Sequence, residues 1–240
     1  MTDQLPIYQK HLSRMTKNIL DKAISLISLI VLSPIFLIAA IGIKISSRGP
    51  VLYKAKRMGK NMIPITVYKF RTMKVGADKE GAITAAHDSR VFPWGNVLRK
   101  TKVDELPQLV NVLIGTMSII GPRPEDIVIV NDYYTEEEKR TLEVLPGLAC
   151  VGSIFNYTHG DLYLKDERTD EAYTDEFLHI KLALDVFYLY HWSLGYDMRI
   201  VIRTIHAILV ASFGKKQQEY PIEYETVFSE NNLDLLEKQM

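Results

Sequence analysis

The sequence predicts a mostly helical α+β fold, in which a membrane-inserted helical segment precedes a compact domain on the cytoplasmic side. Three observations support this prediction. Residues 23–43 hold 21 residues without a charged side chain, close to the roughly 20 that a helix needs to cross a bilayer core. Residues 51–60 and 63–73 are two short β-like segments that flank a turn. Many other apolar residues recur at helical spacing.

The charge distribution is uneven, although the formal net charge of the 240 residues is zero. Residues 1–124 hold 19 lysines and arginines against 7 aspartates and glutamates, whereas residues 125–240 hold 10 against 22. A basic part beside an apolar run suggests contact with an anionic membrane surface, with phosphates, or with both. The one cysteine, Cys150, fits a reducing compartment. The histidines show no zinc-binding spacing, so we expect any metal to be a hard, oxygen-bound cation.

In chain order, residues 1–22 mix basic and apolar positions and are expected to form an amphipathic helix along a membrane interface. The apolar run 23–43 is interrupted in its middle by Ser33 and Pro34, and proline removes a backbone hydrogen bond there. Each half then reaches only about 15 Å, half of a bilayer core. Lysines and arginines flank both ends of the run, and such residues mark the cytoplasmic side.

These features favour a re-entrant helix that enters the membrane, bends at Ser33-Pro34 and leaves through the same face. Two alternatives stay open. Proline kinks also occur in true spanning helices, because neighbouring helices satisfy the freed backbone groups. A buried core helix of a soluble protein is the other alternative, although 21 uncharged residues is long for one. A cleaved signal peptide fits less well, because the run starts late and no clear cleavage site follows it.

Residues 44–213 are expected to form the main domain, and residues 214–240 an acidic tail. A hairpin turns at residues 59–61, where glycine, lysine and asparagine separate the two β-like segments. The other expected elements are a polar loop at 74–95, a helix at 106–120, a rigid Gly-Pro-Arg-Pro segment at 121–124, an acidic helix at 125–145, an acidic loop or exposed helix at 161–176 and helical patterning at 177–213.

Two adjacent carboxylates, Asp104 and Glu105, are the main candidates for chemistry. Taken locally, they favour an ordinary helix start, because aspartate is a good N-cap and Pro107 is tolerated in a first turn. The surroundings favour chemistry, because five basic residues lie nearby in sequence and arginine matches phosphate oxygens well. These residues are Arg90, Arg99, Lys100, Lys102 and Arg123. Such a site beside a membrane segment suits phosphoryl transfer at a bilayer surface.

Several segments together carry a resemblance to a known family. They read SPIFLIAAIGIKISSRGPVLYKAKRMG at 33–59, YKFRTM at 68–73, DSRVFPWGNVLRKTKVDELPQLVNVLIGTMSIIGPRP at 88–124, and LDVFYLYHWSLGYDMRIVIRT at 184–204. With these segments the chain resembles the bacterial sugar transferase family, the small monotopic phosphoglycosyl transferases. The resemblance covers roughly residues 17–204.

The resemblance implies roles for particular residues. Asp104 corresponds to the nucleophile that attacks the sugar-linked phosphate of a UDP-sugar and releases UMP. Glu105 corresponds to a ligand of an essential Mg²⁺, which Asp104 also adjoins. Arg99 and the segment Pro122, Arg123 and Pro124 correspond to positions near the phosphates and the nucleotide. From the residues themselves, Lys69 and Arg71 are candidates for a phosphate or a lipid headgroup, with structural pairing an equal alternative.

The resemblance also implies a setting on the cytoplasmic face of a bacterial inner membrane. The acceptor would be polyprenyl (undecaprenyl) phosphate, and the product would start a surface polysaccharide or glycoconjugate that downstream glycosyltransferases extend. Membrane lipid is thus an expected partner. A homo-oligomer stays open. We do not expect nucleic acid as a partner, because the sequence holds no recognisable module for it.

One stretch departs from the family pattern. After Pro146-Gly147 the family usually has T-G-x-x-Q-V-x-G-R, whereas this chain reads PGLACVGSIFNYTHGD and lacks the glutamine and the Gly-Arg pair. A catalytically altered homologue that acts as a membrane-bound scaffold is therefore the alternative function. For other residues we expect Asp88 and Arg90 to pair with each other, His159 to lie in a surface loop, and Met117 to lie in the core.

Overall fold

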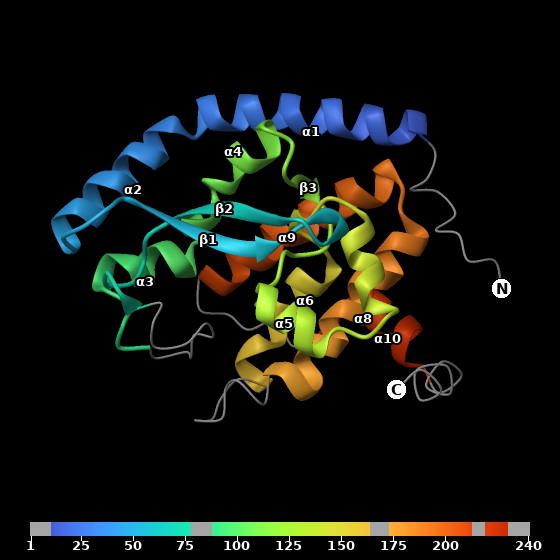
Figure 1. Ribbon diagram of the computed structural model, residues 1–240. Coiled ribbons are helices and arrows are strands. Elements are labelled where there is room, and N and C mark those ends of the chain that lie inside the picture. The colour runs from blue at the N-terminus through green and yellow to red at the C-terminus, as the bar shows by residue number, and fades with distance from the viewer. Residues whose placement is uncertain (1–10, 78–87, 164–172, 213–218, 230–240) are drawn as a thin grey trace.

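The computed structural model describes residues 11–77, 88–163, 173–212 and 219–229. A long helix, α1 (His11–Val31), and its bent continuation, α2 (Ser33–Ser46), lie along one side of the molecule (Figure 1). The hairpin strands β1 (Leu52–Met58) and β2 (Pro64–Phe70) lie beneath them. Most of the remaining helices pack on the side of the hairpin that faces away from α1 (Figure 1).

The other elements are mostly short. They are the 3₁₀ turn η1 (Lys60–Met62), α3 (Pro93–Lys100), the 3₁₀ turn η3 (Val103–Glu105), α4 (Gln108–Leu113), β3 (Ser118–Ile120), α5 (Ile127–Tyr133), the 3₁₀ turn η4 (Glu138–Glu143), β4 (Gly147–Ala149), α6 (Val151–Tyr163), the π-turn η5 (Tyr173–Phe177), α8 (Leu178–His191), α9 (Leu194–Ser212) and α10 (Ile222–Phe228). The predicted mixture of many helices and a small hairpin is therefore confirmed.

The break predicted at Ser33-Pro34 is present, and the two helices meet there at a bend of 61°. Pro34 lies in the first turn of α2, where a missing N–H costs nothing, and the Ser33 hydroxyl donates to the Ile30 carbonyl oxygen over 2.8 Å. Within the described residues, no single helix is long and apolar enough to cross a bilayer, whereas the bent pair together meets that length and composition. Helix α1 is continuous across residue 22, where we expect a boundary from the sequence.

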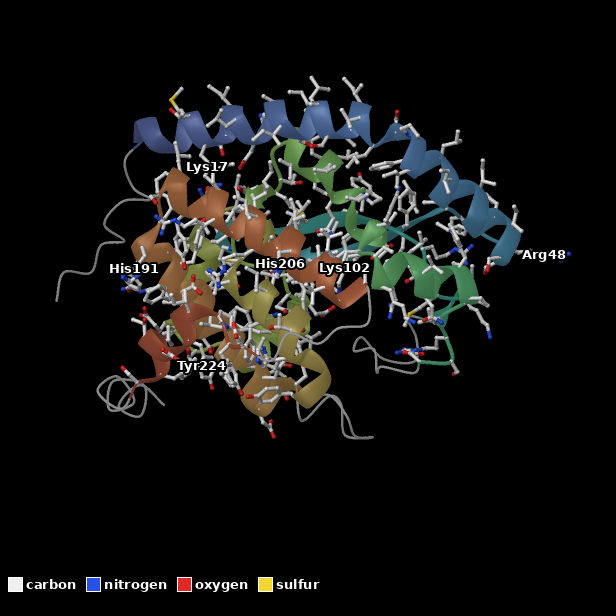
Figure 2. The ribbon with its side chains drawn as sticks, turned by 180° about the vertical axis from the view of Figure 1, so that it is seen from behind. Lys17, Arg48, Lys102, His191, His206 and Tyr224 are labelled. Carbon is white, nitrogen blue, oxygen red and sulfur yellow. The ribbon has the colours of Figure 1, made fainter. Side chains whose placement is uncertain are left out.

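Helix α1 is polar on its inner face and apolar on its outer face. Lys17, Asp21 and Ser25 are buried at successive turns. The Lys17 ammonium contacts Asp197 of α9 over 2.6 Å, and Asp21 accepts a hydrogen bond from Ser118 over 2.6 Å. Side chains project from the outer face of α1 (Figure 2). The exposed apolar residues of α1 include Met15, Ile19, Ile24, Ile27, Ile30 and Val31. This pattern is the reverse of a soluble surface helix, whose apolar face points inward.

Helix α2 is held against α3 by a close contact. A Cβ atom on Gly42 would lie only 2.3 Å from the Trp94 indole nitrogen, so glycine is required for this approach. The indole N–H donates to the Ala39 carbonyl oxygen over 3.3 Å. Ala39 and Ile43 are buried in a small apolar cluster with Phe70, Phe92 and Leu98, so α2 is fixed on the domain.

The hairpin has the predicted turn, with Leu52 opposite Phe70 and Met58 opposite Pro64. Three helices predicted from the sequence are shorter or divided in the structure. The helix expected at 106–120 ends at Leu113, because Gly115 adopts a left-handed φ of 83°, and residues 118–120 pair in parallel with β4. The acidic helix expected at 125–145 divides into α5 and η4, and the patterning at 177–213 divides at Trp192 into α8 and α9.

The acidic regions are only partly described. Within 161–176, the first three residues end α6 and the last four lie in η5, whereas residues 164–172 lie outside the described residues. Part of the expected tail forms α10. Its Glu223 is buried and accepts hydrogen bonds from both terminal nitrogens of Arg203, which ties this part of the tail to α9.

We expect Lys17→Met to lower the free energy of unfolding by about 3–5 kcal/mol, because it leaves the buried Asp197 carboxylate without its cation. Chemical denaturation in detergent measures this difference. Lys22→Met on the exposed side of the same helix is the matched control and should change little. Equal effects of the two substitutions would contradict an anchoring role for the buried ion pair.

Candidate active site

The carboxylate pair lies in a tight turn between α3 and α4. Lys102 adopts a left-handed φ of 56°, and its carbonyl oxygen accepts the Glu105 N–H over 3.2 Å, which closes η3. Asp104 is buried, with 9% of its surface exposed. Neither η3 nor α4 carries a side-chain capping hydrogen bond. The capping role that the local sequence favours is therefore wrong, and the two carboxylates have other contacts.

Glu105 is held by two cations from different elements. Both terminal nitrogens of Arg123 donate to it, over 2.9 Å to Oε2 and 2.5 Å to Oε1, which is a two-pronged arrangement matched to carboxylate geometry. The Lys69 ammonium, from β2, lies 3.9 Å from Oε1. Burial by itself would raise the pKa of Glu105, but the charges of Arg123 and Lys69 outweigh it and hold that pKa well below its usual range. Glu105 is therefore ionised at neutral pH.

Asp104 is in a different state from its neighbour. Its Oδ1 atom is buried and has no hydrogen-bond partner among the residues that the structure describes. Burial and the negative charge of Glu105 raise the pKa of Asp104 to about 6. A buried carboxylate with an unused oxygen is more nucleophilic than a solvated one, yet it is still mostly ionised above pH 7. The environment thus gives the two adjacent carboxylates different properties.

Further cations surround the pair. Lys69 lies among Glu105, Arg123 and Asp104, and burial lowers its pKa to about 8. Arg99, on α3, is held through its Nε by the Thr72 hydroxyl over 2.9 Å, and its charge acts on Asp104. With Lys102 and Arg123 these side chains supply more positive charge than the two carboxylates cancel. The excess favours an anionic ligand such as a diphosphate.

The basic side chains of Arg71 and Arg90 form contacts within the protein. Arg71 is 5% exposed, and its guanidinium donates to Ser47, to the Pro50 carbonyl oxygen over 2.6 Å and to the Met73 carbonyl oxygen. It therefore ties the end of α2 to the end of β2, which is the structural alternative expected for Arg71, and these contacts give no support to a role in phosphate binding. The expected pair of Asp88 and Arg90 is present, with contacts down to 2.6 Å.

Pro122 and Pro124 position Arg123. The Pro122 carbonyl oxygen accepts the Gly147 N–H over 2.8 Å, which fixes this segment beside β4. Both prolines line a small pocket together with Arg123. Met117 is buried as expected, whereas the expectation for His159 is wrong, because it is 1% exposed and stacks on Tyr220 inside the domain.

Sequence reasoning missed Tyr157 as a site residue. It lies on α6, half-buried, with the Lys102 ammonium 4.3 Å from the centre of its ring. Burial, followed by the charge of Glu105, raises the pKa of its hydroxyl. Tyr157 lies in the stretch after Pro146-Gly147 that departs from the family pattern, but that departure does not distinguish the tyrosine from its neighbours.

The residues present fit an Mg²⁺ ion that is bound together with a ligand. Mg²⁺ in phosphoryl-transfer sites typically takes one or two carboxylates and completes its shell with phosphate oxygens and water. Asp104 Oδ1 has no partner among the described side chains, and each Glu105 oxygen keeps a lone pair beyond its contact with Arg123. The described residues hold no cluster of three or more metal-ligating side chains. We therefore expect phosphate oxygens to complete the metal's coordination.

Comparisons with known proteins find similar sequences over most of the chain. The family model described as bacterial sugar transferase matches residues 12–211. A UDP-glucose:undecaprenyl-phosphate glucose-1-phosphate transferase of Escherichia coli K12 is 35% identical over 208 residues, which are 84% of this chain and 42% of that protein. The exopolysaccharide production protein PSS of Rhizobium leguminosarum bv. phaseoli is 36% identical over 82% of this chain and 97% of its own length.

A third relative acts on a different sugar by name. The UDP-N-acetylgalactosamine-undecaprenyl-phosphate N-acetylgalactosaminephosphotransferase of Aeromonas hydrophila is 36% identical over 83% of this chain and 45% of that protein. The chain thus spans less than half of the Escherichia coli and Aeromonas relatives. The named sugars differ although the identities are alike, so similarity at this level does not select a sugar.

We expect Asp104→Asn to stabilise the protein at pH 8. Folding raises the pKa of Asp104 from 3.8 to about 6, so the folded state binds this proton more tightly than the unfolded state does. The wild type therefore loses stability as the pH rises through these two values. The substitution should therefore add about 2–3 kcal/mol to the unfolding free energy above pH 7. The difference should vanish below about pH 4.

Denaturant titrations at pH 4 and pH 8 measure this effect. Asp132→Asn, on the exposed side of α5, is the matched control and should show no such pH dependence. A lower stability of Asp104→Asn at pH 8 would show that the carboxylate is stabilised, not strained, by its surroundings.

Proposed function

Because the chain belongs to the bacterial sugar transferase family, we propose that it transfers a sugar-1-phosphate from a UDP-sugar to undecaprenyl phosphate. The reaction would proceed through a phosphosugar bound covalently to Asp104. The single observation that carries this proposal is the contrast within the carboxylate pair. Glu105 is neutralised by Arg123, whereas Asp104 is buried with an oxygen that has no partner in the described part of the chain.

The proposed chemistry has two displacements. An Asp104 oxygen attacks the sugar-linked phosphorus, a new phosphorus–oxygen bond forms, and the bond to the bridging oxygen breaks, so that UMP leaves with that oxygen. A phosphate oxygen of the lipid then attacks the same phosphorus. The bond to Asp104 breaks, which restores the carboxylate and yields the lipid-linked diphosphosugar. An aspartyl intermediate replaces one difficult displacement with two easier ones.

The surrounding cations would stabilise the negative phosphate oxygens in both steps. Phosphoryl transfer requires mainly correct positioning and stabilisation of negative charge on the phosphate oxygens. Arg99, Lys69 and Arg123 carry the charge for this purpose on three separate elements. Mg²⁺, bound by Glu105 with Asp104 beside it, would neutralise phosphate oxygens as they gain charge. The Lys69 pKa of about 8 leaves it protonated in most molecules at neutral pH.

We further propose that the protein lies on the cytoplasmic face of a bacterial inner membrane, with α1 and α2 as a re-entrant pair. The reversed polarity of α1 supports this placement, because an outward row of large apolar side chains is costly in water. Helix α9 has a second such row, formed by Leu194, Met198, Ile202, Ile205 and Leu209. A lipid-linked acceptor would then reach the site without leaving its membrane.

We expect the wild-type protein to gain the mass of one phosphosugar after mixing with a suitable UDP-sugar and Mg²⁺. Asp104→Asn should abolish this adduct, because an amide is a far weaker nucleophile than a carboxylate. Intact-mass spectrometry measures both results, with Asp132→Asn as a control that should keep the adduct. An undiminished adduct on Asp104→Asn would contradict the assignment of the nucleophile.

A panel of UDP-sugars, assayed separately for UMP release in the presence of Mg²⁺, identifies the sugar. Release with at least one sugar is expected. If a folded protein in detergent releases UMP from none of them, the alternative of a membrane-bound scaffold is favoured.

Single cysteines at Asn18 and Ser46, both exposed, test the membrane placement. In a re-entrant arrangement both should react with a membrane-impermeant thiol reagent from the cytoplasmic side of the membrane only. The parent protein is a built-in control, because burial raises the pKa of the Cys150 thiol far above its usual value and should keep it unlabelled. Labelling of the two positions from opposite sides would show a spanning segment.

A further inference from the structure

Tyr157 has contacts that no step of the proposed reaction uses. It lies in the middle of α6 and points to the turn that carries the carboxylate pair. The Lys102 ammonium is 4.3 Å from the centre of its ring, within the range of a cation–π interaction. Its hydroxyl lies near enough to Glu105 for the charge of that carboxylate to act on it. One side chain therefore contacts Lys102 and lies near Glu105, the residues that flank Asp104.

The turn needs such support. Lys102 adopts a left-handed φ of 56°, which an ordinary side chain takes only at some energetic cost. The three residues of η3 are held by backbone bonds of 3.2 Å from Glu105 to Lys102 and from Leu106 to Val103. In the described part of the chain, no side-chain cap stabilises the N-terminal end of η3. Arg123 holds the turn at Glu105, whereas the Lys102 end has no such contact among the described residues and is more prone to open unless another element holds it.

Helix α6 is rigid enough to supply this support. The Gly152 N–H donates to the buried Asp185 carboxylate over 2.8 Å, and a Cβ atom on Gly152 would meet the Lys181 carbonyl oxygen at 2.5 Å. These contacts seat the start of α6 against α8. Phe155, two residues before Tyr157, is fully buried in the main core. The position of Tyr157 is thus set by the core and not by the turn it touches.

We propose that Tyr157 is a positioning residue that fixes the turn from Lys102 to Glu105 and so aims the Asp104 carboxylate. Its effect on turnover rests on the proposed function, whereas its effect on the turn does not. Burial, followed by the charge of Glu105, raises the pKa of the Tyr157 hydroxyl, so it stays protonated. It therefore adds no negative charge beside Asp104.

The test compares Tyr157→Leu, which removes ring and hydroxyl, with Tyr157→Phe, which keeps the ring over Lys102. Tyr190 offers a matched control. Its hydroxyl contacts Glu137 over 3.0 Å and its ring lies 5.7 Å from the Arg140 guanidinium, so Tyr190→Leu removes the same kinds of contact elsewhere. Each variant is measured as the full-length protein in detergent.

The first readout is hydrogen exchange of the amides from 102 to 106, which requires no substrate. Tyr157→Leu should speed this exchange by roughly tenfold, the scale of one partly buried cation–π contact. Tyr157→Phe should speed it less, and Tyr190→Leu should leave it unchanged. Unchanged exchange in Tyr157→Leu would overturn the proposal, even if the UDP-sugar assay fails for the wild type.

The second readout is UMP release. Tyr157→Leu should lower kcat by about tenfold and change KM for the UDP-sugar by less than about twofold, because a mispositioned nucleophile affects the reacting state more than binding. The pH below which kcat for UMP release falls should also rise. Asp104 is faced by Glu105, Lys102, Lys69 and Arg99, and release of Lys102 removes a charge that favours the ionised form. A change in KM alone would mean that Tyr157 binds substrate instead.

Discussion

The two-pronged contact between Glu105 and Arg123 is the interaction on which the site depends. It joins the turn after α3 to the Gly-Pro-Arg-Pro segment, which β3 and β4 hold in place through the Pro122–Gly147 hydrogen bond. It also decides the charge of the pair. Because Arg123 and Lys69 keep Glu105 ionised, the negative charge of Glu105 adds to the burial of Asp104, and together they raise the pKa of Asp104 to about 6. The cations beside Glu105 thus give two neighbouring carboxylates different pKa values.

The second constraint is the polarity of α1. A helix that buries Lys17, Asp21 and Ser25 and exposes isoleucine and valine is arranged for a domain on one side and an apolar phase on the other. The buried polar contacts also make this helix part of the domain, since they reach α9, β3 and α4. The bent helix pair and the site are therefore parts of one packed structure, which suits the proposed reaction between a soluble nucleotide sugar and a lipid.

Much of this structure could be predicted from local sequence. The hairpin, the break at Ser33-Pro34 and the convergence of Asp104, Glu105 and Arg123 were all indicated by turn residues, by proline and by charge. The rest depends on contacts between distant segments. Strands β3 and β4 are three residues each and pair in parallel, so neither shows a strand pattern alone. Tyr157 reaches Lys102 only because α6 packs beside the turn. The burial of Lys17 depends on Asp197, which lies 180 residues away in the sequence.

The central claim is that Asp104 carries the phosphosugar, and locating the label tests it most directly. The protein would be mixed with a UDP-sugar labelled with ³²P at the sugar-linked phosphate, quenched in acid, digested and mapped by mass spectrometry. We expect the label on the peptide that contains Asp104, and we expect hydroxylamine to release it, as it does from acyl phosphates. Label on another residue, or UMP release that never leaves label on the protein, would contradict the account.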